Sequence, residues 1–173
     1  MAAMSEPAAV SWFADTIGQP VRSWESMRCR PGNEVHRVDL TDGSTAYVKA
    51  APGLAAERDR LRWLTGRVPV PPVLAFHADD VDRLATAALP GRDLAMPEHL
   101  ADPAKLVDAL AAALRTFHDL DPTDCPFGDQ AGVLTHGDAC LPNFLAEGDH
   151  VTGYLDLGAA GLAPREHDLA AAV

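Results

Sequence analysis

Short strand-like runs, in which apolar residues are mixed with polar ones, fill much of the first half of the chain. The expected strands cover residues 21–27, 34–40, 44–50, 73–78 and 83–88. A short helix is expected at residues 8–17, and another at about residues 53–65, where Gly66 ends it. The first half is therefore expected to form a β-sheet accompanied by helices.

One long helix is expected in the second half of the chain. Asp102 is suited to its N-cap and Pro103 to its first position. The apolar residues that follow recur on one helical face: Leu106, Leu110, Ala113, Leu114 and Phe117. The preceding segment Leu89-Pro90-Gly91-Arg92 has the composition of a linker. Two parts joined near residue 90 are thus expected.

The segment His136-Gly137-Asp138-Ala139-Cys140-Leu141-Pro142-Asn143 follows this helix, and Asp156-x-Gly158 begins thirteen residues after Asn143, with a short hairpin expected between them. The spacing matches the H-x-D-x-x-x-x-N and D-x-G patterns of kinases. In phosphoryl transfer the protein mainly orients the acceptor hydroxyl and neutralises phosphate charge through Mg²⁺. The alternative is that Asp138 and Asn143 are turn residues that satisfy backbone donors.

A lysine in the expected strand 44–50 is the second candidate feature. The chain has two lysines, Lys49 and Lys105, against twelve arginines, so a lysine at position 49 stands out. Lysine is a compact point charge on a flexible stem and is suited to phosphates. Glu57, on the next expected helix, would pair with Lys49 as in kinases. The alternatives are a solvated charge at a strand edge for Lys49 and an ordinary surface carboxylate for Glu57.

Residues 136–143 and the following Asp156-x-Gly158 resemble the aminoglycoside phosphotransferases, especially the 3'-phosphotransferase group, and the likeness extends from about Val35 to Asp168. It implies an α+β, protein-kinase-like fold with an antiparallel sheet and one main helix in the first lobe. That nucleotide-binding lobe would cover residues 1–88, a hinge 89–95 and a mostly helical catalytic lobe 96–173.

The resemblance also assigns roles to individual residues. Asp138 would be the catalytic base, and Asn143 and Asp156 would be the Mg²⁺ ligands. Lys49 and Glu57 would serve the binding of ATP, the second cofactor implied. Asp168 would be a buried residue that supports the catalytic loop.

The chain departs from the family pattern in three places. Residues 28–33, between the first two strands, contain one glycine and no G-x-G-x-x-G, so Arg28 and Arg30 would have to meet the phosphates. Members of the family carry several helices between a segment like Cys125-Pro126-Phe127 and the catalytic loop, and more helix after the region of Asp168. They also tend to have an arginine where Ala159 and Ala160 stand. The chain is therefore expected to be a shortened member.

The charge of the chain bears on its partners. A formal net charge of −11 argues against binding to nucleic acid or anionic membranes. From residue 119 onward the chain has ten acidic residues and one basic residue, Arg165. This excess of negative charge would attract a cationic aminoglycoside. The alternative is a solvated acidic surface that only promotes solubility.

Three scattered cysteines indicate reduced thiols and a cytoplasmic protein. Neither they nor the seven histidines have the spacing of a zinc site. The N-terminus lacks the pattern of a signal peptide, and no run of eighteen apolar residues could span a membrane.

Three functions agree with these features. The first is ATP-dependent transfer of a phosphoryl group to a hydroxyl of an aminoglycoside antibiotic. The second is the same reaction on another small hydroxyl compound, such as choline, a sugar amine or homoserine. The third is a truncated, non-catalytic remnant that retains nucleotide binding. The missing helices predict that aminoglycoside phosphorylation by this chain is weak or absent, together with low thermal stability or self-association.

Overall fold

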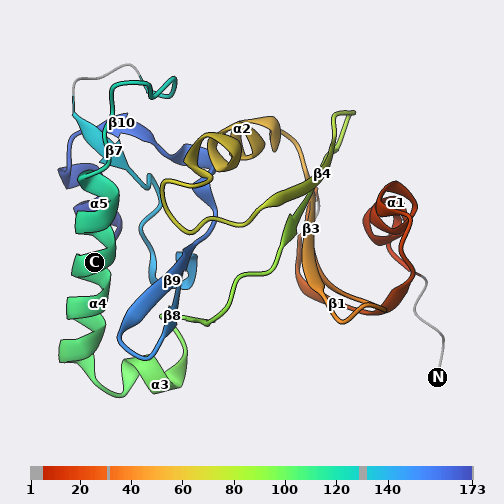
Figure 1. Cartoon of the computed structure of the whole chain (residues 1–173), viewed down its shortest axis with the longest axis horizontal. Helices are drawn as coiled ribbons and strands as arrows, with labels where there is room; N and C mark the ends of the chain where they lie inside the picture. Colours follow the sequence, from red (N-terminus) through yellow and green to blue (C-terminus); the bar gives the residue numbers. More distant parts are fainter. Residues whose placement is uncertain (1–5, 31, 129–131, 173) are drawn as a thin grey trace. The chain divides into compact units, whose positions relative to one another are not determined.

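A computed structural model describes residues 6–30, 32–128 and 132–172, with only the backbone for residues 28–30 (Figure 1). The chain forms two compact units. The first consists of Met1–Arg58 and Pro72–Ala88, and the second of Asp59–Pro71 and Leu89–Val173. The boundary at Ala88 lies where the sequence suggests a linker, whereas residues 59–71 group with the second unit.

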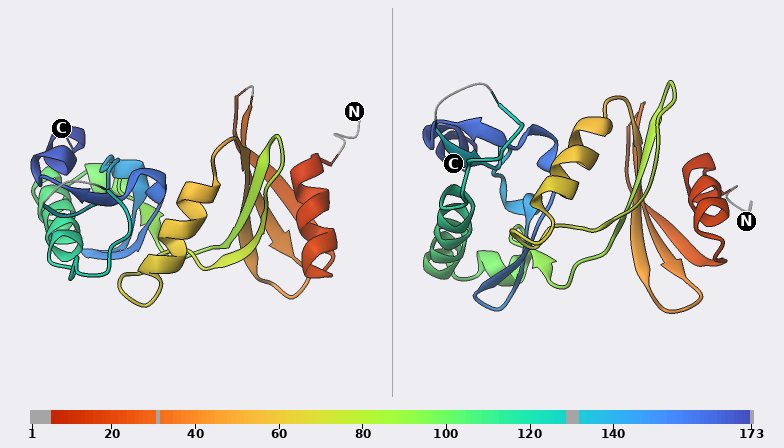
Figure 2. Two further views of the ribbon diagram at one scale, coloured as in Figure 1. Left: turned by 90° about the horizontal axis from the view of Figure 1, so that it is seen from above. Right: turned by 45° about the horizontal axis from the view of Figure 1, so that its top comes forward.

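The first unit is built on a five-stranded antiparallel sheet with strand order β1-β2-β3-β5-β4 (Figure 2). Its strands are β1 (Val21–Arg30), β2 (Asn33–Leu40), β3 (Thr45–Ala51), β4 (Val73–His77) and β5 (Asp82–Ala87). These strands confirm the five strand-like runs expected from the sequence. Along β2 and β3 every second side chain is buried, as a sheet with one covered face requires.

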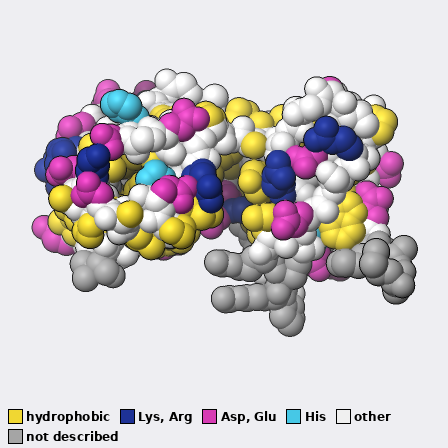
Figure 3. Space-filling view, turned by 90° about the horizontal axis from the view of Figure 1, so that it is seen from below, with side chains coloured by type: hydrophobic (Ala, Val, Ile, Leu, Met, Phe, Trp, Pro, Cys, Tyr) yellow, Lys and Arg dark blue, Asp and Glu magenta, His cyan; other side chains and the backbone are white. Residues whose placement is uncertain are grey.

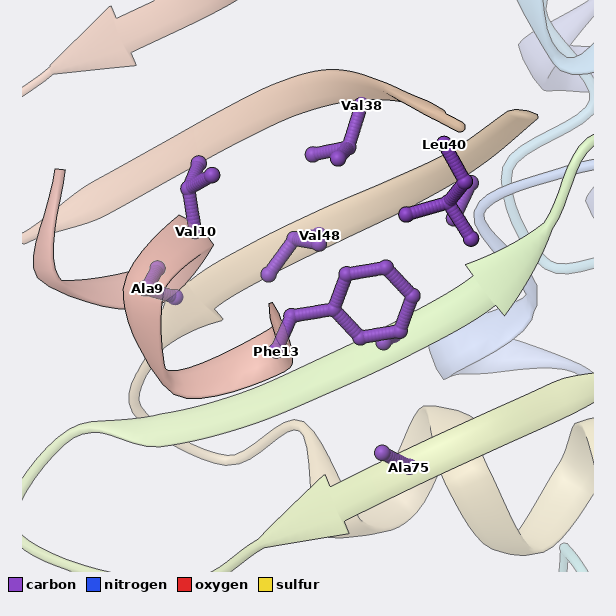
Figure 4. Close-up of a cluster of buried hydrophobic side chains, with 10 residues drawn as sticks. Ala9, Val10, Phe13, Val38, Leu40, Val48 and Ala75 are labelled. Carbon is purple, nitrogen blue, oxygen red and sulfur yellow. The ribbon is translucent and has the colours of Figure 1, made fainter. Parts of the chain in front are cut away.

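Helix α1 (Ala8–Ile17) covers one face of this sheet and has the bounds expected from the sequence. Gly18 ends it in the left-handed conformation, with φ of 64°. Figure 4 shows side chains of α1 and of the sheet meeting in one buried cluster, which includes Ala9, Val10, Phe13, Val38, Leu40, Val48 and Ala75. Burial of this apolar surface is the main force that holds α1 to the sheet.

Helix α2 (Ala55–Leu64) begins after Gly53 and ends at Leu64. Its apolar side chains Leu61 and Leu64 are both 1% exposed, which agrees with the expected amphipathic helix. Gly66 follows with φ of 81°, so the glycine expected to end the helix does adopt a conformation that favours glycine. Helix α2 passes from one unit into the other, since the division falls between Arg58 and Asp59.

The second unit contains the long helix α4 (Pro103–His118). The Asp102 side chain accepts a hydrogen bond from the N–H of Lys105 at 3.3 Å, which confirms the expected N-cap. The unit also contains these short elements: β6 (Arg92–Asp93), α3 (Pro97–Leu100), β7 (Val133–Thr135), η1 (Leu141–Asn143), β8 (Phe144–Glu147), β9 (His150–Tyr154), η2 (Leu157–Ala159), β10 (Gly161–Ala163) and α5 (Glu166–Ala171).

Two small sheets of the second unit position its polar loops. Strands β6, β8 and β9 form one sheet, with β8 and β9 as the expected hairpin, and β10 pairs antiparallel with β7. Helix α4 packs on β7 and β9, and its buried Phe117 ring meets the ring of Tyr154 on β9 at 5.2 Å. The Tyr154 hydroxyl donates to the carbonyl of Ala113 at 3.1 Å, which ties the end of β9 to this helix. In the described part of the chain, no helix has the length and hydrophobicity needed to cross a membrane.

Candidate active site

The segment that carries Asp138 starts where strand β7 ends. Thr135, the last residue of β7, donates its hydroxyl to the carbonyl of Gly161 on β10 at 2.9 Å. Gly137 has φ of 83°, and a Cβ at this position would lie 2.4 Å from the carbonyl oxygen of Ala159. Because only glycine fits both the conformation and the space, the loop passes directly against the segment that follows Asp156.

Asp168 holds the beginning of this loop. Its carboxylate accepts the backbone N–H of His136 at 2.9 Å and that of Gly137 at 2.8 Å. The ring of His118, at the end of α4, places Nε2 2.9 Å from the same carboxylate. Asp168 is 0% exposed, and a buried carboxylate needs such partners to remain in the interior. The structure thus confirms Asp168 as a buried support of the loop.

His136 lies in the interior beneath Asp138. Its ring packs against the rings of Phe117, Phe144 and Tyr154, with centroid distances between 5.0 and 6.4 Å. Burial lowers the pKa of His136, although the charge of Asp168 and then that of Asp138 oppose this effect. A neutral ring can accept a hydrogen bond, and Nδ1 lies 3.3 Å from the backbone nitrogen of Asp138. His136 therefore holds the backbone of Asp138 from the protein interior, through this hydrogen bond.

Asn143 fixes the side chain of Asp138. Its Nδ2 atom donates to Oδ2 of Asp138 at 3.0 Å and to the carbonyl of Asp138 at 2.9 Å. Asn143 is buried, whereas Asp138 is exposed. A carboxylate oriented by a buried amide and open to solvent on its other side has the form that a base for an incoming hydroxyl requires.

Asp156 is brought to the same region by the hairpin. The N–H of Leu155 donates to the carbonyl of Asn143 at 2.8 Å, so the residue before Asp156 is joined to the end of the loop. Asp156 has φ of 54°, a left-handed conformation that no other non-glycine residue adopts in the described ranges. Such conformations are unfavourable and are found preferentially at functional sites. The structure therefore brings together the three residues singled out by the spacing in the second half.

The negative charge of this region affects the pKa of Cys140. Burial is the main cause that raises the pKa of its thiol, and the carboxylate of Asp138 raises it further, with a smaller contribution from Asp156. Both carboxylates thus act on one half-buried side chain. Because the thiol is neutral near pH 7, Cys140 acts there as a packing residue.

In the first unit, Lys49 and Glu57 form the expected pair. Nζ of Lys49 lies 2.7 Å from Oε1 of Glu57, and the two side chains are 22% and 10% exposed. Lys49 comes from β3 and Glu57 from the first turn of α2, where a carboxylate is also favoured by the helix dipole. The pairing is confirmed, while the role of Lys49 towards phosphates remains a prediction.

The turn between β1 and β2 carries the candidate phosphate-covering loop. The two strands pair as far as Arg30 and Asn33, and Gly32 has φ of 75°. Pro31 and the side chains of Arg28 and Arg30 lie outside the described part of the chain. Contact of these arginines with phosphates therefore remains a prediction.

The donor atoms of this region suit Mg²⁺ better than zinc. Within residues 6–30, 32–128 and 132–172 no three His, Cys, Asp or Glu side chains gather as a metal site. Asn143 directs its amide nitrogen at Asp138, so its oxygen is the atom left to bind a cation. Together with the carboxylate of Asp156 it offers the oxygen ligands that Mg²⁺ prefers. The residues therefore fit this ion.

One residue of the site was not expected from the sequence. His118 contacts Asp168 from a position 50 residues earlier in the chain. A signal was present, because His118 follows Leu114 by four residues and thus shares the buried face of α4. A polar side chain on an apolar face requires a buried partner.

The surface of the molecule bears on the expected attraction of a cation. On the face seen in Figure 3, acidic side chains are interspersed with basic and apolar ones. Attraction of a cationic ligand to that face would therefore depend on the net charge of −11 more than on one continuous acidic patch.

The chain matches the family model described as the phosphotransferase enzyme family, over residues 32–132 and 129–173. The chain is similar to an aminoglycoside 3'-phosphotransferase of Niallia circulans, with 29% identity over 82% of this chain and 74% of that protein. It is also similar to a streptomycin 3''-kinase of Streptomyces griseus, with 30% identity over 73% of this chain and 68% of the relative.

Solved structures show the same relationship. An aminoglycoside-3'-phosphotransferase of type VIII superposes with a TM-score of 0.80 and 26% identity, over 95% of this chain and 80% of that one. An aminoglycoside phosphotransferase of Streptomyces rimosus gives a TM-score of 0.73 with 26% identity, over 94% and 80% of the two chains. That enzyme has also been solved with ADP and streptomycin. The α+β, kinase-like fold expected from the motifs is thus confirmed.

The comparisons also bear on the expected shortening. The two stretches matched by the family model meet at residues 129–132, between Phe127 and the catalytic loop. The alignment with the relative from Niallia circulans runs over 194 positions, more than the 173 residues of the chain, so that relative contains residues without a counterpart here. The alignment length agrees with a shortened chain, and the break in the family match lies where the sequence suggested a missing insert.

Proposed function

Since this chain belongs to the phosphotransferase enzyme family, we propose that it transfers the γ-phosphoryl group of ATP to a hydroxyl group of an aminoglycoside, as an antibiotic-resistance kinase. The observation that carries the proposal is the joint placement of Asp138 and Asn143, with Asp156 next to them, on a loop held by buried Asp168. The relatives named for this reaction support the acceptor class.

In this reaction Asp138 is the general base. Asn143 occupies one oxygen of its carboxylate, which leaves the carboxylate free to turn its other acceptor sites to a hydroxyl. The proton of the acceptor hydroxyl moves to Asp138 as the hydroxyl oxygen attacks the γ-phosphorus of ATP. The bond from this phosphorus to the oxygen that bridges it to the β-phosphate breaks, and ADP leaves with that oxygen. Phosphoryl transfer depends mainly on alignment. The hydrogen bond from Asn143 matters because it orients the carboxylate, and the bond from the Asp138 N–H to His136 matters because it holds the backbone of Asp138.

Asn143 and Asp156 would hold Mg²⁺ through an amide and a carboxylate oxygen. When bound, this ion supplies neutralisation of the charge that develops on the phosphate oxygens. Lys49, oriented by Glu57, would contact the phosphates of ATP from strand β3. With these roles, residues 1–88 form the nucleotide-binding lobe, residues 89–95 the hinge and residues 96–173 the catalytic lobe. Because ATP is the phosphoryl donor, we also propose that the protein acts in the cytoplasm.

The shortening favours two alternatives to this function. By resemblance, the helices that are missing between Phe127 and the catalytic loop build most of the aminoglycoside pocket. A chain without them could act on a smaller hydroxyl compound, or retain nucleotide binding without turnover. Exposed apolar side chains of the second unit, Val107 and Leu169 at 63% and 54%, are also consistent with self-association.

A binding and turnover experiment distinguishes these functions. Titration of ATP with and without Mg²⁺ should show binding that strengthens with the ion. ADP release should then depend on an acceptor, tested with kanamycin, streptomycin, choline and homoserine, and should be absent in Asp138→Asn. Mg²⁺-dependent binding without ADP release from any acceptor would support the non-catalytic alternative. No ATP binding at all would exclude the whole group of functions.

A further inference from the structure

Arg60 on helix α2 makes two directional contacts within the second unit. Its Nε atom donates to the carbonyl of Ala160, a residue 100 positions later in the chain. Its guanidinium carbon lies 4.6 Å from the centre of the Phe127 ring, in the geometry of a cation–π interaction. The arginine is thus held by two contacts of different kinds, a hydrogen bond to a backbone carbonyl and the face of an aromatic ring.

The partners of Arg60 are themselves fixed. The carbonyl of Phe127 accepts the N–H of Leu162 at 3.0 Å, and the Phe127 ring meets Trp63 edge to face at 6.2 Å. Trp63 in turn donates its indole N–H to the carbonyl of Asp124 at 3.1 Å. We refer to Arg60, Trp63 and Phe127 as the Arg60 cluster. This cluster joins the second half of α2 to segments 124–128 and 160–162.

The carbonyl that Arg60 binds ends the turn that begins at Asp156. After Asp156, helix η2 is closed by a hydrogen bond of 3.1 Å from the N–H of Ala160 to the carbonyl of Leu157. The backbone of Ala159 fills the space beside Gly137, the residue that precedes Asp138. Arg60 therefore contacts the chain immediately after the point where this turn touches the catalytic loop.

Such a contact is needed because the conformation of Asp156 is not self-supporting. A non-glycine residue with φ of 54° persists only where the surroundings over-determine it. The start of the turn is held by the bond from Leu155 to Asn143, and its end by Arg60. Arginine suits this task because it combines a directional donor with a flat face for an aromatic ring, which lysine lacks.

We propose that Arg60 is a positioning residue for Asp156. Arg60 holds the 157–160 turn against the catalytic loop and thereby fixes the position of the Asp156 carboxylate oxygen that would bind Mg²⁺. The part that concerns Mg²⁺ rests on the proposed function; the anchoring of the turn does not. Arg60 lies outside the motifs from which Asp138, Asn143 and Asp156 were chosen.

The anchoring is tested first, on the whole protein without nucleotide or metal. Hydrogen–deuterium exchange reports the N–H groups of Ala160 and Leu162, which are both hydrogen-bonded. Arg60→Ala should speed exchange in the peptide that contains them by about 10-fold, as expected from losing a charge-assisted hydrogen bond. Arg62→Ala is the matched control, because Arg62 is exposed on the same helix. Equal exchange in the two variants would overturn the anchoring.

The effect on Asp156 is tested by calorimetric titration of ATP at several Mg²⁺ concentrations. Arg60→Ala should require about 10–100-fold more Mg²⁺ for tight ATP binding, the usual effect of losing a residue behind a ligand. Binding of ATP without Mg²⁺ should stay as in Arg62→Ala, a pattern that general destabilisation would not produce. Unchanged Mg²⁺ dependence in a variant with faster exchange would overturn the positioning role.

Two further variants keep the proposal testable if Arg60→Ala does not fold. Arg60→Lys retains the charge but should show most of the loss, and Phe127→Leu should weaken the same Mg²⁺ dependence, with effects that are not additive in the double variant. Wild-type behaviour of both would contradict the role of the contact. If the wild-type protein itself shows no Mg²⁺-dependent ATP binding, the proposed function and the Mg²⁺ part fall together, while the exchange result still decides the anchoring.

Discussion

The two units hold their polar functional residues by different means. In the first unit Lys49 stands on strand β3 and Glu57 on helix α2, and one contact of 2.7 Å joins them. In the second unit Asp138 and Asn143 lie on an irregular loop. The first two N–H groups of this loop, those of residues 136 and 137, both donate hydrogen bonds to the carboxylate of Asp168. Regular elements place side chains through their own backbone hydrogen bonds, whereas an irregular loop needs added acceptors in the interior. The second unit should therefore be more sensitive to the loss of one buried residue.

The largest expected effect concerns Asp138, the exposed end of the loop. Asp138→Ala should lower turnover by about 10²–10⁴-fold, the usual contribution of a positioned general base. ATP affinity and the free energy of unfolding should change little, because Asp138 is exposed. Steady-state kinetics with calorimetry checks this, and wild-type turnover in the variant would remove Asp138 from the mechanism.

Loss of the buried support should instead affect folding. Asp168→Ala should lower the free energy of unfolding by about 3–5 kcal/mol, because it leaves two N–H groups and His118 buried without their partner. Urea denaturation of this variant beside Asp149→Ala, an exposed aspartate of the same unit, measures the difference. Similar values for the two variants would mean that the loop does not depend on Asp168.

The protonation of His136 should make stability depend on pH. Burial lowers its pKa in the folded state below the usual 6.5, so the unfolded chain binds more protons when the pH falls below about 6.5. Stability should therefore decrease on acidification, by at most about 1.4 kcal/mol per pH unit from this residue. Denaturation at pH 7 and pH 5 should show a smaller pH effect in His136→Phe than in the wild type. An unchanged difference would show that other groups cause it.

The smallest expected change in stability is that of Lys49. Lys49→Ala should lower the free energy of unfolding by about 1 kcal/mol or less, since the pair is partly exposed. It should nonetheless weaken ATP binding, whereas Lys105→Ala, which removes the other, exposed lysine, should not. If Lys49→Ala destabilised the protein as much as Asp168→Ala, the contrast between the two units would be wrong.

Much of the fold follows from local pattern. The five strands, helices α1, α2 and α4 and the β8–β9 hairpin all lie close to the expected positions. The spacing of Asp138, Asn143 and Asp156 also predicted their association, because a short hairpin returns the chain to its starting point. The partnership of Lys49 and Glu57 followed from known kinase chemistry and is present.

By itself the sequence determined these elements and the residue types that carry the chemistry, because hydrophobic periodicity, caps and turns act over a few residues. Only the tertiary structure decided what holds the chemistry in place. His118 meets Asp168 across 50 residues, and Arg60 meets Ala160 across 100. The left-handed backbone of Asp156 likewise depends on its surroundings. Such contacts arise when packed elements bring distant polar groups into an interior where each must find a partner, and no local pattern encodes which partner that is.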